Sequence, residues 1–127
     1  MSGWLINISL VFIGGGIGSA LRYGVGKWMI SKIDWSPILA TFSVNVVGSL
    51  LLGFLFAWVE KNQPTSLNPL WLLLGVGFCG GFTTFSTFAL ENINLIKDGN
   101  FLMLFTYSLG SLAAGFLLAW VAIQLVG

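Results

Sequence analysis

Residues 62–90 read NQPTSLNPLWLLLGVGFCGGFTTFSTFAL and contain no charged side chain. Three further uncharged runs lie elsewhere in the 127-residue chain, at residues 1–21, 35–59 and 99–127. A helix needs about 20 apolar residues, at ~1.5 Å each, to cross a hydrocarbon core roughly 30 Å thick. The sequence therefore predicts four transmembrane helices, over about residues 4–27, 37–59, 69–95 and 101–125.

The overall composition supports a membrane protein and excludes several functions. Charged residues make up 7% of the chain and hydrophobic residues 57%, whereas a soluble domain carries about 25% charge. Histidine is absent, which excludes imidazole bases and His-containing metal sites. Cys79 is the only cysteine, so no intrachain disulfide can form, and a net charge of +1 offers no basic surface for nucleic acid. We therefore expect neither an enzyme nor a nucleic-acid-binding protein.

The boundaries of the predicted helices have their own signals. Ser36-Pro37 and Asn68-Pro69 each place a capping side chain before a proline at the first helical position. Asp98-Gly99-Asn100 is a turn sequence. The first run lacks the basic start of a signal peptide, so we interpret it as a mature helix. These features predict an all-α membrane protein with one domain, residues 1–127.

The distribution of Lys and Arg favours one orientation in the membrane. Three lysines and Arg22 lie at one end of the predicted bundle, and Lys61 lies at the other. By the positive-inside rule this bias of four to one places both termini outside the cytoplasm.

Small residues recur four positions apart in every predicted helix. The pairs are Gly14 and Gly18, Gly15 and Ser19, Ser49 and Gly53, Gly77 and Gly81, and Ser111 and Gly115. Such spacing lets membrane helices approach closely, and we assign most of these residues to packing.

The third predicted helix is unusually polar at its centre. Residues 79–88 read CGGFTTFSTF, with two glycines and four hydroxyl residues at the expected bilayer midplane. Glycine lowers helix propensity by roughly 1 kcal/mol, and hydroxyl side chains can bond released backbone groups, so we expect the helix to break here. Backbone carbonyls at such a break can coordinate a cation, although a kinked helix without function is the alternative.

Several side chains near this segment are candidates for contact with an ion. Phe85 and Phe88 lie three apart on one helical face, where their ring edges carry partial positive charge that an anion can approach. Asn45, four residues after Thr41, places an amide in an apolar run, where either an interhelical hydrogen bond or a ligand would satisfy it. For each of these residues, simple packing in the bundle is the competing interpretation.

Two further groups of polar residues lie outside the central segment. Tyr107 and Ser111 stack one turn apart on the fourth predicted helix and form a polar stripe. Arg22 and Glu91 lie towards helix ends, where snorkelling or a mutual ion pair would explain them.

The combination of these motifs resembles the Fluc fluoride channels, the CrcB-like family, over essentially the whole chain. Its parts occur in order: Gly14-Gly15-x-x-Gly18-x-x-x-Arg22-Tyr23, Thr41-x-x-x-Asn45-x-x-Gly48-Ser49, Gly80-Gly81-Phe82-Thr83-Thr84-Phe85-Ser86-Thr87-Phe88 followed by Glu91, and Tyr107 with Ser111. The string at residues 80–88 is the specific part, because the glycines of the first helix alone would be weak.

The resemblance implies a passive fluoride-selective channel and a role for each matching residue. It implies an antiparallel, dual-topology homodimer with two pores, in a bacterial or archaeal cell membrane. It also implies a structural sodium ion at the dimer centre. The implied roles are ring-edge contacts from Phe85 and Phe88, an amide donor from Asn45, a hydroxyl track from Tyr107 and Ser111, further hydroxyls near the path from Thr84, Ser86 and Thr87, a polar entrance from Arg22, Thr41 and Glu91, and carbonyl ligands for sodium from Gly80 and Thr83.

Two features depart from what the resemblance implies. One turn beyond Ser111, Gly115 stands where another hydroxyl would continue the track, which predicts a shorter track in this chain. The charge bias favours one orientation, whereas dual topology requires both.

Two other functions fit a chain of this size and composition. A small proton-coupled multidrug exporter also has four helices, but it needs a deep carboxylate, and the first predicted helix has none. A non-transporting subunit would use its small residues only to pack against a larger partner. That second alternative leaves the polar string at residues 80–88 unexplained.

Overall fold

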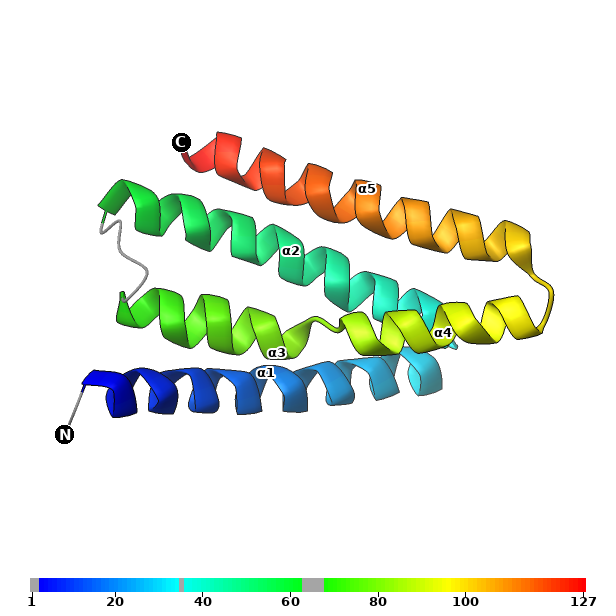
Figure 1. Ribbon diagram of the computed structural model, residues 1–127, viewed down its shortest axis with the longest axis horizontal. Coiled ribbons are helices and arrows are strands. Elements are labelled where there is room, and N and C mark those ends of the chain that lie inside the picture. The colour runs from blue at the N-terminus through cyan, green and yellow to red at the C-terminus, as the bar shows by residue number, and fades with distance from the viewer. Residues whose placement is uncertain (1–2, 35, 63–67) are drawn as a thin grey trace.

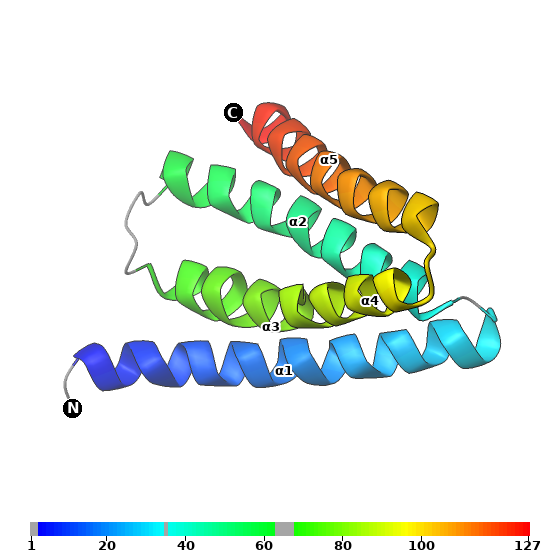
Figure 2. The same ribbon diagram turned by 45° about the vertical axis from the view of Figure 1, so that its right-hand side comes forward.

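The chain folds into long helices that lie side by side (Figures 1 and 2). The computed structural model describes residues 3–34, 36–62 and 68–127. Its elements are α1 (Gly3–Lys32), α2 (Pro37–Asn62), η1 (Trp71–Cys79), α3 (Gly80–Phe82), α4 (Phe85–Lys97) and α5 (Phe101–Val126). The segments η1, α3 and α4 follow one another along a single path, so the described residues form four passes. The start of α1 and the end of α5 lie at the same end of the bundle (Figure 1).

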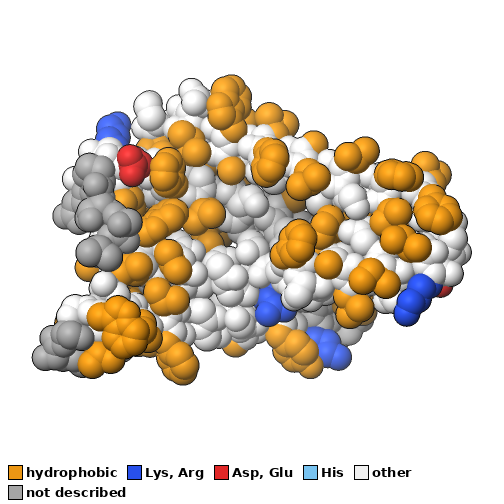
Figure 3. Space-filling view, viewed as in Figure 1, with side chains coloured by type: hydrophobic (Ala, Val, Ile, Leu, Met, Phe, Trp, Pro, Cys, Tyr) orange, Lys and Arg blue, Asp and Glu red, His pale blue; other side chains and the backbone are white. Residues whose placement is uncertain are grey.

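The four passes are long and apolar enough to cross a membrane. Hydrophobic side chains cover the lengths of the helices in the space-filling view (Figure 3). Large apolar side chains such as Phe12 and Leu102 are about four-fifths exposed (79% and 82%). Because water would strongly disfavour such a surface, lipid is its natural solvent and the protein is an integral multi-pass membrane protein.

The helix boundaries agree with the sequence signals at most positions. The helix α2 begins at Pro37, with the Ser36 hydroxyl accepting from the Leu39 N–H at 3.3 Å. The Asn68 carboxamide oxygen accepts from the N–H groups of Leu70 and Trp71 at 2.8 and 3.3 Å. These caps satisfy N–H groups that have no partner in the first helical turn.

The predicted end of the first helix is wrong by about a turn. The helix was expected to end near Lys27, but α1 continues to Lys32 and ends before Asp34, whose φ of 60° lies in the left-handed region. No glycine or proline turn interrupts residues 27–32. A charged side chain alone does not stop a helix, because Lys has a high helix propensity and extends its ammonium group to the interface.

The widened turns of η1 were not expected from the sequence. Residues 71–79 form a π-helix, and the Gly80 N–H donates to the carbonyl oxygens of Gly75 and Gly77. A Cβ atom on Gly75 would lie only 2.7 Å from the Trp71 ring. The missing side chain leaves room for the indole, so the packing of Trp71 explains glycine at this position.

The contact between α1 and the η1–α3 segment depends on glycines from both sides. A Cβ atom on Gly14 or Gly18 would collide with the carbonyl oxygen of Leu73 or Phe78. A Cβ atom on Gly77 would lie 2.9 Å from the Val11 carbonyl oxygen. The predicted packing role of these glycines is therefore confirmed, as the backbones approach closely only without side chains.

We expect Gly18→Ala to lower the thermal stability of the folded protein. The added methyl group would meet backbone atoms of Phe78, which cannot rotate away as a side chain can, and overpacking of this kind costs about 1–3 kcal/mol. The matched control is Gly16→Ala on the same helix, since nothing lies within 4 Å of a Cβ atom there. Thermal unfolding in detergent measures both variants, and equal midpoints would contradict the packing role.

Candidate functional site

Two residues with extended backbones separate α3 from α4. The torsion angles of Thr83 are φ −90° and ψ 162°, and those of Thr84 are φ −148° and ψ 120°. The helix resumes at Phe85, where the Thr84 hydroxyl accepts from the Thr87 N–H at 3.2 Å. Thr84 is thus the N-cap of α4, a position that threonine favours because its side chain replaces a missing helical acceptor.

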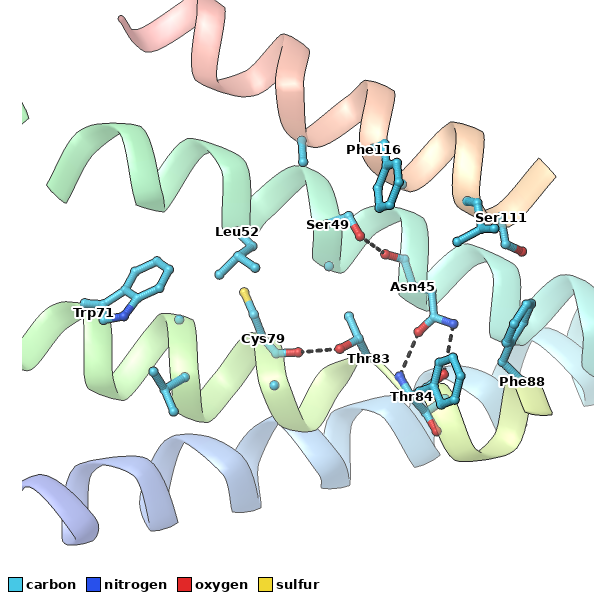
Figure 4. A pocket seen from close by; sticks show the side chains of 18 residues that line it. Asn45, Ser49, Leu52, Trp71, Cys79, Thr83, Thr84, Phe88, Ser111 and Phe116 are labelled. Carbon is cyan, nitrogen blue, oxygen red and sulfur yellow. Dashed lines mark hydrogen bonds between the residues drawn. The ribbon is translucent and has the colours of Figure 1, made fainter. Parts of the chain in front are cut away.

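The side chain of Asn45 on α2 bonds both backbone groups of Thr84. Its Nδ2 donates to the Thr84 carbonyl oxygen at 3.0 Å, and its Oδ1 accepts from the Thr84 N–H at 2.7 Å (Figure 4). An amide has one donor side and one acceptor side, so it can satisfy both groups of one peptide backbone. Of the two expected roles for this amide, the structure shows the interhelical hydrogen bond.

The hydrogen bonds around this segment release two backbone carbonyls. In a continuous α-helix, the N–H groups of residues 84 and 87 would donate to the carbonyls of Gly80 and Thr83. Here these N–H groups instead donate to Asn45 Oδ1 and Thr84 Oγ1. The carbonyl oxygens of Gly80 and Thr83 are therefore available to other ligands, and both residues line the same cavity.

Arg22 on α1 bonds a third carbonyl of this segment. Its Nε donates to the Gly81 carbonyl oxygen at 3.0 Å, and the Ser19 hydroxyl lies 3.5 Å from the same oxygen. The interpretation of Arg22 and Glu91 as an ion pair is wrong, because these two side chains have separate partners within the described residues. Arg22 instead places positive charge at the carboxyl end of a helical segment, where it is stabilising.

Glu91 is the centre of a second polar cluster, between α2, α4 and α5. Its Oε2 accepts from the Thr41 hydroxyl at 3.1 Å, and its Oε1 accepts from the Tyr107 hydroxyl at 2.8 Å. Thr41 is buried, and Tyr107 is only 5% exposed. The structure thus brings Thr41, Glu91 and Tyr107 together, while Arg22 lies apart from them beside α3.

A neighbouring pair of residues was missed by the sequence analysis. The Asn92 carboxamide oxygen accepts from the Ser108 hydroxyl at 3.2 Å, and its Nδ2 donates to the Phe88 carbonyl oxygen at 3.1 Å. Asn92 follows Glu91 in α4, and Ser108 follows Tyr107 in α5. The hydrogen bonds Tyr107–Glu91 and Ser108–Asn92 therefore join the two helices at adjacent positions. The available signal was the adjacent polar pairs Glu91-Asn92 and Tyr107-Ser108 on helices joined by a short turn.

Three aromatic rings form a row from α4 to α5. The ring centroids of Phe85 and Phe88 are 5.9 Å apart, and those of Phe88 and Tyr107 are 5.0 Å apart with the planes at 60°. The edge-to-face contact between Phe88 and Tyr107 is a favourable arrangement of aromatic rings. The Phe85 ring is 80% exposed on the single chain, whereas Tyr107 is buried.

A cavity of about 520 Å³ opens beside this aromatic row, between α2, α5 and the η1–α4 path (Figure 4). Seven of the expected site residues line it: Asn45, Gly80, Thr83, Thr84, Phe85, Phe88 and Ser111. The Ser111 hydroxyl is buried and has no hydrogen-bond partner among the described residues. A buried hydroxyl of this kind is a strong candidate for contact with a ligand, because polar groups are otherwise paired.

The other expected site residues do not line the cavity. Ser86 is exposed, and its hydroxyl lies 3.4 Å from the Thr84 hydroxyl. Thr87 lies further along α4, where its backbone completes the cap. Tyr107 reaches the cavity only through the ring of Phe88.

Comparison with known proteins gives a consistent result over nearly the whole length. Residues 9–123 match the family model described as CrcB-like protein, Camphor Resistance (CrcB). The chain is 43% identical over 123 residues to a protein of Gloeothece citriformis, with 96% of this chain and 98% of the relative covered. It is 41% identical to a protein of Oceanobacillus iheyensis (94% and 90% covered) and 43% identical to one of Listeria innocua (95% and 98% covered). The first two relatives are named fluoride-specific ion channel FluC, and the third is named fluoride-specific ion channel FluC 1.

Proposed function

The chain belongs to the CrcB-like family, and from this premise we propose that it is an ion channel through which fluoride leaves the cell passively. The observation that carries the proposal is the cavity in which aromatic edges, a carboxamide and the buried Ser111 hydroxyl occur together. The bacterial relatives support a location in the cell membrane.

The chemistry of the cavity suits a small and strongly hydrated anion. Fluoride sheds its water only where hydrogen-bond donors or positive ring edges replace it. Phe85 and Phe88 provide the edges, and Ser111 provides a donor. None of these groups carries a full positive charge, so the ion is held weakly enough to leave again, which conduction requires.

The polar cluster around Glu91 forms the entrance of the proposed path, where the Thr41 and Tyr107 hydroxyls donate to the carboxylate. Tyr107 and Ser111 then form the hydroxyl track along α5, and the ring of Phe88 lies between the cluster and the cavity. Thr84, Ser86 and Thr87 have supporting roles at the start of α4, and Arg22 contributes positive charge at the Gly81 carbonyl.

We propose that two antiparallel copies complete the channel. On the single chain the cavity is open and Phe85 is exposed beside the polar groups of Asn45 and Ser111. Lipid cannot solvate non-helical backbone or unpaired hydroxyl groups, so this face must be covered by protein or line a water-filled cavity. A second copy in the opposite orientation, as the family resemblance implies, would close two equivalent pores, and each pore would use residues of both chains.

The carbonyl groups of Gly80 and Thr83 suit a sodium ion at the proposed dimer centre. Hard cations prefer oxygen ligands, and these two carbonyls are released from their usual helical donors while lining the face that a second copy would cover. Two carbonyls from each subunit would hold the ion. Its bound charge would offset the carbonyl dipoles that meet there and would join the two subunits.

Fluoride efflux from liposomes tests the proposed function. Vesicles containing the purified protein are loaded with fluoride in sodium-containing buffer, with a potassium gradient and valinomycin to clamp the voltage. We expect rapid loss of fluoride, while matched chloride-loaded vesicles keep their chloride. Fluoride loss no faster than from empty vesicles would reject the channel and would favour the exporter or the non-transporting subunit.

Removing sodium is expected to impair the assembled protein. If the carbonyls of Gly80 and Thr83 meet their counterparts without a cation, their dipoles repel one another at the proposed interface. Purification and assay with sodium replaced by N-methylglucamine on both sides should reduce fluoride flux and the fraction of dimer in size-exclusion chromatography. Restoring sodium should recover both, and full activity without sodium would contradict the cation site.

A further inference from the structure

The hydroxyl track on α5 stops at Gly115, and a serine from another helix occupies the adjacent position. A Cβ atom built on Gly115 would lie 3.5 Å from the Ser49 hydroxyl oxygen of α2, and nothing else lies closer. A side chain at residue 115 would therefore contact the Ser49 hydroxyl at the cavity wall. Its absence leaves the Ser49 hydroxyl as the polar group at this level.

From this arrangement we propose that Ser49 continues the hydroxyl track where α5 has Gly115, and that it donates a hydrogen bond to the permeating anion. The inference rests on the proposed function and adds a residue from α2 to the path. It replaces the expectation that the track is shorter in this chain.

Ser49 and Ser111 approach the same cavity from facing helices. Both residues line it, as do Gly115 and Asn45, and Figure 4 shows Ser49 on α2 and Ser111 on α5. Since Ser111 and Gly115 are one helical turn apart on the same face of α5, Ser49 marks the next step along the cavity wall. The donors along the cavity wall are then Ser111 and Ser49, beyond the Tyr107 hydroxyl that donates to Glu91.

The Ser49 hydroxyl is able to exchange its present partner for an anion. It donates to the Asn45 carbonyl oxygen at 2.8 Å, one turn back in α2. In the helix that carbonyl also accepts the backbone N–H of residue 49, so it keeps a partner when the hydroxyl rotates away. The exchange therefore leaves no buried acceptor without a donor.

The test moves the hydroxyl from one helix to the other. Ser49→Ala is expected to reduce fluoride efflux by about tenfold, the effect of losing one hydrogen bond to an ion. Adding Gly115→Ser to that variant should restore most of the flux, because its side chain has room and reaches the same part of the cavity. The dimer fraction of both variants should match that of the unmodified protein.

Ser43→Ala is the matched control. Ser43 lies on the same helix and donates an equivalent hydrogen bond, to the Leu39 carbonyl oxygen at 2.8 Å, but it does not line the cavity. We expect its flux to remain unchanged. Ser49→Cys keeps the side-chain size with a poorer donor, and a reduced flux in that variant would separate loss of the donor from loss of packing.

The outcomes distinguish this inference from the function on which it rests. If the unmodified protein releases no fluoride, the proposed function fails. If it conducts and Ser49→Ala conducts equally well, only the role of Ser49 is rejected. A loss in Ser49→Ala that Gly115→Ser does not restore would also reject it, because the position of the hydroxyl would then not be what matters.

Discussion

Replacing Phe85 or Phe88 with isoleucine is expected to reduce fluoride efflux by about 10- to 100-fold. Each substitution removes a positive ring edge, and an interaction with an ion contributes about 1.5–3 kcal/mol. Isoleucine keeps most of the apolar volume. Since the Phe85 ring is 80% exposed on the single chain, its loss should affect the fold of the subunit little.

Phe12→Ile is the control for these variants, because Phe12 is 79% exposed and lies on α1, away from the cavity. Efflux of fluoride from liposomes is measured for the three variants at equal protein density, after size-exclusion chromatography has shown the same dimer fraction. We expect Phe12→Ile to conduct normally. Normal flux in both Phe85→Ile and Phe88→Ile would refute the ring-edge contacts.

The four membrane passes could be predicted because they depend on local properties of the chain. The uncharged runs show which segments avoid water. The prolines at helix starts and the Asp98-Gly99-Asn100 turn restrict the backbone torsion angles of a few neighbouring residues. Gly99 adopts φ 70° in that turn, as the sequence suggested. The end of α1 was misplaced, because the position of a charge shows where the membrane ends and a helix can continue beyond it.

The partners of the polar side chains could not be predicted, because they depend on how distant segments pack. Asn45 and Thr84 are 39 positions apart, and Arg22 and Gly81 are 59 apart. The sequence showed that each polar group needs a partner, and only the packing of α1 and α2 against α3 selects it. The same limit explains why Asn92 and Ser108 were missed and why an ion pair between Arg22 and Glu91 was considered.

The residues of the candidate site divide into those that shape the path and those that face it. Arg22 and the Thr84 hydroxyl are occupied by the backbone around the interruption between α3 and α4. Ser111 and the exposed ring of Phe85 remain available in the cavity. Substitutions in the first group should therefore change stability and flux together, whereas those in the second group should change flux alone.

Asn45→Leu is expected to abolish fluoride flux and to destabilise the protein. The leucine has a similar volume but bonds neither the N–H nor the carbonyl oxygen of Thr84. Leaving a buried polar group without a partner costs about 1–3 kcal/mol, and here two groups lose theirs in the membrane. The freed segment can then return to helix, which would reorient Thr83 and remove the carbonyl from the cavity.

Asn62→Leu tests whether this effect belongs to Asn45 or to any carboxamide on α2. Asn62 donates to the Trp58 carbonyl oxygen at 2.8 Å at the exposed end of the same helix, so its loss affects only a local bond. Thermal unfolding in detergent and efflux from liposomes are measured for both variants. Asn45→Leu should lower the midpoint and lose flux, and Asn62→Leu should change neither. If Asn45→Leu lost flux at an unchanged midpoint, Asn45 would act mainly on the anion, and its bonds to Thr84 would not be what holds the interruption in place.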